Sequence, residues 1–466
     1  MYFSSVTFLF LFLPLTCLGY FLTPKGYRNY TLLVANLLFY IWIEPIFFFL
    51  LLFIILVDYF SGLSIEKWRH KKRVCKGVIL FSVLTNAAVL LMFKYVLLFP
   101  NFVPMVFQEE TPILEFMIPL GISIYTLQGL SYLLDLYWNK IKVQKNFVNL
   151  AMYISFFPQL VAGPIIRYTD ISRDLTTRTV NATKISKGYG FFIRGLAKKV
   201  LLSDVLLSTW SSISSNEIAQ LSVGSAWIGI LCFSFGIYLY FSGYSDMARG
   251  IAKMLGFEIP NNFNYPYVAK SATEFWRRWN ISLTVWFKTY IFSKIAPHSS
   301  SFMLAVAKLM GIWACIGLWY GKEANFLLWG IYFGMIILME QLFLSPFLEK
   351  LPKLLQRCYT FFVVIFGWVI FQMETLEQIL GYCHALFFAV PWDDAAGYYL
   401  SICWFPLLLA YFASKNLPHR IAGNLENKYP RLSLWTNVGW ELLLTLLCLI
   451  WVSSGIPSDT LTLIRL

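Results

Sequence analysis

The chain has 466 residues, of which 58% are hydrophobic, 19% aromatic and only 13% charged. A soluble domain carries about 25% charged residues, so this composition excludes a soluble enzyme, a disordered regulator and a collagen-like fibre. The net charge of +13 would suggest nucleic-acid binding in a soluble protein. In a chain this apolar, the basic residues are instead expected on cytoplasmic loops, where they orient membrane helices. We therefore expect a polytopic membrane protein with no nucleic-acid partner.

Apolar runs of about 20 residues, the length that crosses a bilayer as a helix, occur along most of the chain. The first three are expected at residues 2–22, 30–44 and 45–63, and a basic block at residues 67–76 follows them. Because cytoplasmic loops are enriched in Lys and Arg, this block is predicted to be cytoplasmic, which places the N-terminus outside. Further spans are expected at residues 77–100, 113–138, 223–240, 302–319, 326–344, 360–371, 398–414 and 434–452.

Three segments fit this pattern less well. Residues 147–166 carry Pro and Gly, and residues 188–207 carry several charges, so both are predicted to be re-entrant or tilted. The cations of the second segment are expected to reach the membrane interface or to bind an anionic head group; they are Arg194, Lys198 and Lys199. Residues 373–390 are predicted to form an amphipathic surface helix. No repeat or linker divides the chain, so we expect an all-α protein with ten or eleven spans in one domain, residues 1–466.

The cysteines and histidines argue against a metal site. None of the eight cysteines forms a C-x-x-C pair, and most lie in apolar segments, which is not the pattern of a zinc site or a disulfide framework. The chain has only four histidines, which are His70, His298, His384 and His419. We expect no bound metal and no bound cofactor.

Polar residues gather in the middle third of the chain, where a charge at membrane depth suggests a functional site. Asp246 ends an apolar run, the loop at residues 261–267 is rich in Asn, and residues 271–282 combine charges with tryptophans. Ser271 and Glu274 have the spacing of a helix capping box. Glu274 can then pair with Arg277 or Arg278 on the same helix. One interpretation is an interfacial helix held by tryptophans and paired charges; the other is a polar helix that lines a cavity inside the bundle.

Several of these stretches resemble the membrane-bound O-acyltransferase family. The similarity is strongest to its bacterial branch, which includes the alginate O-acetyltransferase membrane subunit and the teichoic-acid D-alanyl transfer protein. The matching motifs run from the first span to about residue 380 and include Ile118–Thr126, Ser155–Pro164, Phe241–Asp246, Asn262–Tyr267 and Glu274–Leu283.

The resemblance implies a ring of helices around a central funnel and tunnel, in the bacterial cytoplasmic (inner) membrane. Family members pass an acyl group from a donor to a hydroxyl acceptor, which in the bacterial branch is usually an extracytoplasmic glycan. The implied partners are membrane lipid, an acyl-donor protein or acyl-CoA, and an extracytoplasmic or membrane subunit of an acylation complex.

The sequence departs from the family where the family has its histidines. These positions are Asn280, Tyr320 and Phe333, and the surrounding residues fix the register. None of the four histidines of the chain falls at a matching position. A phenol with a pKa near 10 is a poor base at neutral pH, so histidine-based catalysis is predicted to be impaired or lost.

The candidate site follows from these matches. The candidate catalytic residues are Tyr320 and Asn280. The candidate substrate-binding residues are Asp246, Asn264, Glu274, Trp276, Arg277, Arg278, Trp319 and Asn325.

Three hypotheses remain open at this point. The chain is an active but divergent O-acyltransferase, or a non-catalytic scaffold or regulator of a glycan acylation complex, or an acyl conduit or transporter. Inverted repeats would favour a transporter, and none is visible in the sequence. The acceptor, the donor and the acyl chain length are not predicted.

Overall fold

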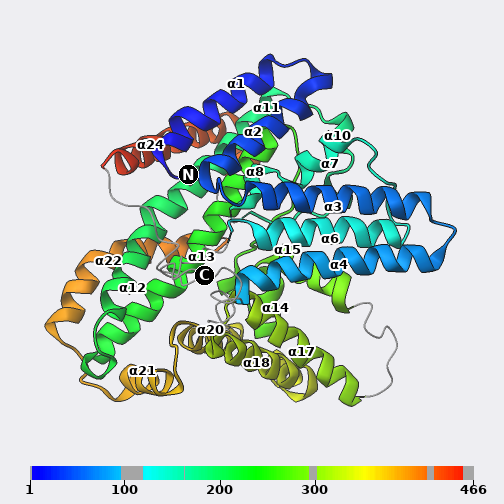
Figure 1. Cartoon of the computed structure of the whole chain (residues 1–466). Helices are drawn as coiled ribbons and strands as arrows, with labels where there is room; N and C mark the ends of the chain where they lie inside the picture. Colours follow the sequence, from blue (N-terminus) through cyan, green and yellow to red (C-terminus); the bar gives the residue numbers. More distant parts are fainter. Residues whose placement is uncertain (1–2, 96–118, 162, 293–301, 417–423, 455–466) are drawn as a thin grey trace, which may run out of the picture. The chain divides into compact units, whose positions relative to one another are not determined.

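The computed structural model describes residues 3–95, 119–161, 163–292, 302–416 and 424–454 (Figure 1). Within these ranges the chain is helical and contains no β-strand, which confirms the all-α prediction. The residues form two compact units, Met1–Phe192 with Met247–Pro260 and Ile193–Asp246 with Asn261–Leu466. One domain for the whole chain stays a prediction, as does the ring of helices around a funnel.

The described residues contain eight helices that are long and apolar enough to cross a membrane, which confirms a multi-pass membrane protein. They are α3 (Phe48–Lys67), α4 (Lys72–Tyr95), α13 (Val223–Met254), α17 (Phe302–Tyr320), the run Ala324–Lys350, α20 (Lys353–Gln372), α22 (Asp394–Ala413) and α24 (Pro430–Ser453).

Eight is fewer than the ten or eleven spans that the sequence predicts, because several predicted spans form short helices. The first predicted span forms one shorter apolar helix, Phe8–Leu22, in which η1 (Phe8–Phe12) runs directly into α1 (Leu13–Leu22), and the second becomes α2 (Arg28–Ile43) with 16 residues. At 1.5 Å per residue such a helix is about 24 Å long, against about 30 Å of bilayer core. α6 (Ile122–Tyr137) also has 16 residues, and the start of its predicted span lies outside the described residues.

In the first unit, α3, α4 and α6 pack against one another (Figure 1). α2 packs against α7 (Phe147–Ile154) and α8 (Phe157–Leu160). The helix is interrupted between α7 and α8, while a re-entrant or tilted path for this segment stays a prediction. Buried Asn36 binds the backbone on both sides of the interruption: its Nδ2 donates to Met152 O at 3.2 Å and its Oδ1 accepts from Phe157 N at 3.1 Å. The unit also contains η2 (Lys25–Tyr27), α9 (Tyr168–Ile171), α10 (Asp174–Thr177) and most of α11 (Ala182–Ala197).

The re-entrant alternative for residues 188–207 is wrong. α11 continues through the π-helical turn η4 (Lys198–Ser203) into α12 (Asp204–Ser214) without a break. The helix stays continuous because its buried cation has an acidic partner. Lys199 is fully buried, and its Nζ lies 2.9 Å from Asp204 Oδ2. The predicted position at the membrane interface is therefore wrong for Lys199, and for Lys198 it stays a prediction.

The second unit positions the candidate site. It contains, besides the spans already named, η5 (Ile218–Gln220), η6 (Pro266–Val268), α14 (Ala272–Arg278), α15 (Ile281–Phe287), η7 (Lys288–Phe292), α18 (Ala324–Met339), η8 (Glu340–Leu344), α19 (Ser345–Lys350) and α21 (Leu376–Phe388). α17 and α18 form the most closely packed helix pair (Figure 1). Gly317 and Gly330 lie at their crossing, where an added Cβ on either would collide with the opposite backbone. The predicted surface helix at residues 373–390 forms as α21, with a Thr375–Gln378 capping box at its start.

Candidate functional site

The polar motif at residues 271–282 forms two short helices, α14 and α15, joined at Trp279 and Asn280. Ser271 is the N-cap of α14, as predicted, and its hydroxyl accepts from Glu274 N at 3.0 Å. The reciprocal half of the capping box differs from the prediction. Glu274 Oε2 accepts from Lys270 N at 2.8 Å, one residue before the N-cap, because its other carboxyl oxygen is held by Arg278.

Glu274 pairs with Arg278, the i+4 residue. Arg278 Nη2 and Nε lie 2.6 and 3.0 Å from Glu274 Oε1, and Arg278 Nη1 donates to Asn264 O at 3.1 Å. Burial alone would raise the pKa of Glu274, but the hydrogen bond from Lys270 N and the Arg278 guanidinium outweigh it, so the pKa is lowered below its usual value. The pair fixes α14 to the loop before it.

Arg277 does not belong to this group. It lies on the exposed side of α14, and its Nε donates only a long bond of 3.4 Å to Thr273 O. The expectation that all the charges of this helix face the interior is therefore wrong for Arg277. Successive helical residues are rotated by about 100° around the helix axis. Arg277 therefore cannot share the face on which Glu274 and Arg278 lie.

A buried glutamate from a distant part of the sequence closes the N-terminus of α14. Glu340 Oε1 accepts from Ala272 N at 2.7 Å, and Oε2 accepts from Thr273 N at 2.8 Å and from Thr273 Oγ1 at 2.6 Å. The Tyr359 hydroxyl also donates to Glu340 Oε1, at 3.2 Å. These are N–H groups that a helix cannot satisfy internally. Glu340 thus orients the helix that carries the candidate site.

Asn280 is expected within a helix, but it lies in the turn before α15. Its backbone has the left-handed conformation (φ 41°, ψ 58°). Asn tolerates this conformation better than most residues. Asn262 holds the turn: its backbone O accepts from Ile281 N at 2.9 Å and its Oδ1 accepts from Ser282 N at 3.0 Å. Asn264 N also donates to Arg278 O at 2.9 Å, while the Asn264 side chain is exposed.

Tyr320 and Asn280, the two candidate catalytic residues predicted from the resemblance, contact each other. Side-chain hydrogen bonds link Tyr320, the last residue of α17, to Asn280 and to Trp279. The Trp indole can only donate, so the phenol oxygen accepts that bond and its own O–H can donate to a third group. The Tyr320 ring packs edge-on against Trp329 and Phe371, at centroid distances of 5.2 and 5.7 Å.

Aromatic side chains surround this pair of residues. Trp276 lies 5.3 Å from Trp329 and 4.9 Å from Phe333 between ring centroids, and Trp279 lies 5.1 Å from Trp368. Phe333, at the third family histidine position, is fully buried among these rings. The Nε1 atoms of Trp276 and Trp329 are buried and have no acceptor among the described residues. The site is therefore rich in hydrogen-bond donors and carries no base at the matched positions.

The remaining candidates have other partners. Asp246 Oδ2 lies 2.6 Å from Lys198 Nζ, which also donates to Ser242 Oγ at 2.9 Å. Asn325 is buried, and its Nδ2 donates to Phe371 O at 2.8 Å, which fastens α18 to the end of α20. Trp319 is half-buried and contacts Phe287.

Neither of the two histidines in the described part of the chain belongs to this group of residues. His70 lies in the loop between α3 and α4, and His384 is exposed on α21. His298 and His419 lie outside the described residues.

Three residues of this site were missed from the sequence. The sequence assigns no role of their own to Trp279, within residues 271–282, and Asn262, within the loop at residues 261–267. The sequence does contain a signal for Glu340. It is a single charged residue in an apolar run, and a lone charge at membrane depth suggests a functional role. Its partner, the start of α14, lies almost 70 positions earlier and could not be inferred.

Comparisons with known proteins agree with the motifs of this site. Residues 139–384 match the model of MBOAT, the membrane-bound O-acyltransferase family. The chain belongs to this family. The match contains α14, α15, Asn280, Tyr320 and Glu340.

Curated relatives cover most of the chain. A probable alginate O-acetylase of Pseudomonas aeruginosa is 32% identical over 401 residues, 84% of this chain and 76% of that protein. A peptidoglycan O-acetyltransferase of Helicobacter pylori is 30% identical over 413 residues, 81% of this chain and 78% of that protein. A teichoic acid D-alanyltransferase of Bacillus subtilis is 26% identical over 278 residues, 54% of this chain and 68% of that protein.

Proposed function

We propose that this protein works in the O-acylation of an extracytoplasmic glycan at a bacterial cytoplasmic membrane, and that it has lost the histidine-based step. The support for the first part is its similarity to an alginate O-acetylase and a peptidoglycan O-acetyltransferase. The support for the second is the hydrogen-bonded group formed by Tyr320, Asn280 and Trp279. The acyl donor, a carrier protein or acyl-CoA, reaches the site without any bound cofactor.

The chemistry of this group suits an acyl carbonyl. Tyr320 supplies a phenol O–H, and the unpaired indole N–H groups of Trp276 and Trp329 lie in the same aromatic cluster. Donors aimed at a carbonyl oxygen stabilise the negative charge that develops when a hydroxyl attacks it. Removing the proton from that hydroxyl needs a base, and a positioned base contributes roughly 10²–10⁴-fold. Tyr320 and Asn280 supply donors and orientation but not this base.

A second candidate is a non-catalytic subunit that keeps the acyl-binding site and regulates or scaffolds an acylation complex. The absence of a histidine at all three matched positions favours it. Both candidates share the membrane location and an extracytoplasmic or membrane partner. They differ in whether the isolated protein transfers an acyl group.

The test is acyl transfer from a labelled donor to a candidate glycan by membranes that contain the protein. We expect wild type to be silent or at least about 10²-fold slower than the double variant Asn280→His with Tyr320→His. Tyr332→Phe is the matched control, because the Tyr332 hydroxyl donates to Val363 O at 2.9 Å and does not touch Asn280. If wild type transfers as fast as the double variant and Tyr320→Phe abolishes this while Tyr332→Phe does not, the loss of the catalytic step is refuted.

A further inference from the structure

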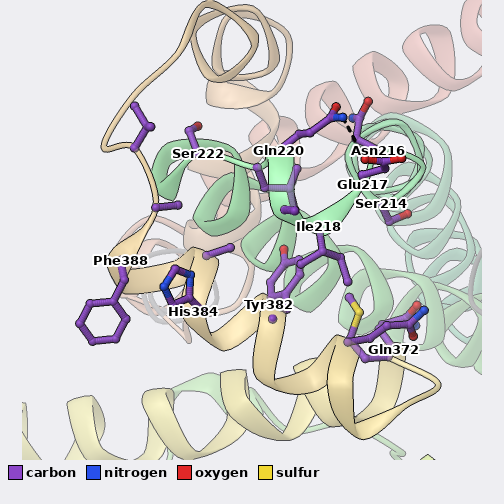
Figure 2. Close-up of a pocket in the computed structure, with 18 of the residues that line it drawn as sticks. Ser214, Asn216, Glu217, Ile218, Gln220, Ser222, Gln372, Tyr382, His384 and Phe388 are labelled. Atoms are coloured by element: carbon purple, nitrogen blue, oxygen red, sulfur yellow. Dashed lines mark hydrogen bonds between the residues drawn. The ribbon is translucent and has the colours of Figure 1, made fainter.

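A cavity lies in the second unit, at one end of its helices. It has a volume of about 1110 Å³, slightly above the range of roughly 300–1,000 Å³ for small-molecule sites. Its walls are the end of α12, the segment 215–222 with η5, and α21 with the start of α22 (Figure 2). None of the residues proposed above for acyl binding lines it.

The walls of this cavity are held by hydrogen bonds between distant segments. Val223 N donates to Val390 O at 2.9 Å and Gly224 N donates to Pro391 O at 3.1 Å. At the base, the buried Tyr382 hydroxyl donates to Ala226 O at 2.8 Å. The cavity is therefore a built feature of this unit.

The lining mixes apolar and polar side chains, and its charged side chains are all acidic. Besides apolar side chains and His384, it contains hydroxyl and amide side chains and three carboxyl groups, Glu217, Glu377 and Asp393, but neither Lys nor Arg. Asp393 Oδ1 accepts from Ser222 Oγ at 2.7 Å and from Ala396 N at 2.9 Å. Burial would raise the pKa of Asp393, but these bonds outweigh it and lower the pKa, so the group is ionised at neutral pH.

The distribution of cations places this cavity on the extracytoplasmic side. No Lys or Arg occurs between residues 200 and 248 or between residues 358 and 414, the two stretches that supply the lining. Cations stand instead at the opposite ends of the same helices, with Lys353 and Arg357 at the start of α20 and Lys415 just after α22. Basic residues mark the cytoplasmic ends of membrane helices.

The lining also restricts the chemistry of the ligand. Phosphate and carboxylate groups are normally held by Arg, Lys or helix N-termini, and this lining supplies three carboxyl groups and no Lys or Arg. Phospholipid head groups, coenzyme A and polyuronates are therefore disfavoured. Hydroxyl and amino groups can bond to the carboxyl, amide and serine side chains, and the exposed ring of Phe388 at the rim offers an apolar face (Figure 2).

We propose that this cavity binds a neutral or amino-bearing oligosaccharide from the extracytoplasmic side and rejects polyanionic glycans. The choice of a saccharide rests on the proposed function, whereas the preference for uncharged or cationic ligands rests on the lining alone. The cavity then selects the acceptor glycan, apart from the site that binds the acyl group.

Binding to the purified full chain, in a detergent without sugar groups, tests this proposal. The probes are tetrasaccharides of glucosamine, N-acetylglucosamine and mannuronate, with tetralysine as a fourth probe. We expect the glucosamine tetramer to bind at least about tenfold more tightly than the mannuronate tetramer, with the N-acetylglucosamine tetramer between them. Equal or tighter binding of mannuronate overturns the proposal, as does binding of tetralysine with no saccharide bound.

Matched variants assign the binding to this cavity. Glu217→Gln with Glu377→Gln should weaken glucosamine tetramer binding about tenfold and change N-acetylglucosamine tetramer binding less than threefold. Glu374→Gln removes a charge from the same segment outside the lining and should change neither. Gly381→Phe should fill the cavity, while Gly381→Ala adds a Cβ that meets only Ile218 Cγ2, at 3.4 Å, and should leave binding intact. Unchanged binding in Gly381→Phe overturns the assignment.

These measurements need no acyl donor, so they are independent of the transfer assay. If no saccharide binds but the transfer assay gives the expected result, only the proposal for the cavity is refuted. Saccharide binding with rapid wild-type transfer refutes the loss of the catalytic step alone.

Discussion

Glu340 should be one of the most destabilising positions to mutate in the second unit, although it lies far from α14 in the sequence. Its carboxyl group accepts from two backbone N–H groups and one hydroxyl at the start of α14. Glu340→Ala leaves these three donors without their acceptor, and Ala272 is fully buried there. A buried donor left unsatisfied costs about 1–3 kcal/mol, so we expect a loss of about 3–5 kcal/mol.

Thermal unfolding of the purified protein in detergent measures this loss. A thiol-reactive dye reports the unfolding of the second unit through its buried cysteines, Cys232, Cys403 and Cys448, once the other five cysteines have been replaced by Ser. Glu340→Gln should lose about 1–3 kcal/mol, since the amide can accept one bond but places a donor against Thr273.

Glu349 provides the control, because it is an exposed glutamate on α19, nine residues along the same helical run. Glu349→Ala should change stability by no more than about 0.5 kcal/mol. The reasoning fails if Glu340→Ala melts at the same temperature as Glu349→Ala. It also fails if Thr273→Val, which removes one partner, costs as much in the Glu340→Ala background as in wild type, because coupled residues are not additive.

Three further predictions concern α14 and the membrane topology. Arg278→Leu should destabilise the protein by about 1–2 kcal/mol through the loss of its bonds to Glu274 and Asn264, whereas Arg277→Leu should stay within about 0.5 kcal/mol; equal effects in a melting assay would contradict the sidedness of the helix. The pKa of Glu274 is lower in the folded than in the unfolded protein, where it is about 4.3, so its stabilisation is present above that pH and is lost as the pH falls through the folded value. Glu274→Gln should therefore weaken the dependence of the melting temperature on pH below about pH 4.5, and an unchanged acid profile would refute this. Reporter fusions should place residues 67–76 in the cytoplasm and the N-terminus outside; the reverse orientation would overturn the topology.

The sequence by itself determined the class of protein and the local structure of its central motif. Composition and apolar runs predict membrane helices because the bilayer leaves almost no other way to satisfy the backbone. The N-cap at Ser271 and the pairing of Glu274 follow from spacings of three and four residues, which one helical turn brings together. The motifs identified the family, since they span residues that are neighbours in the chain.

Tertiary structure alone decided which distant residues meet. Glu340 and Ala272, or Tyr320 and Asn280, are tens of residues apart, and no local period relates them. Helix lengths also depended on the fold: several apolar runs end early because side chains such as Asn36 bind the backbone at a break. Lys199 is buried rather than interfacial because Asp204 lies within reach in the folded helix. Such pairings arise from packing, where the cost of burying one polar group is met by another that only the fold brings near.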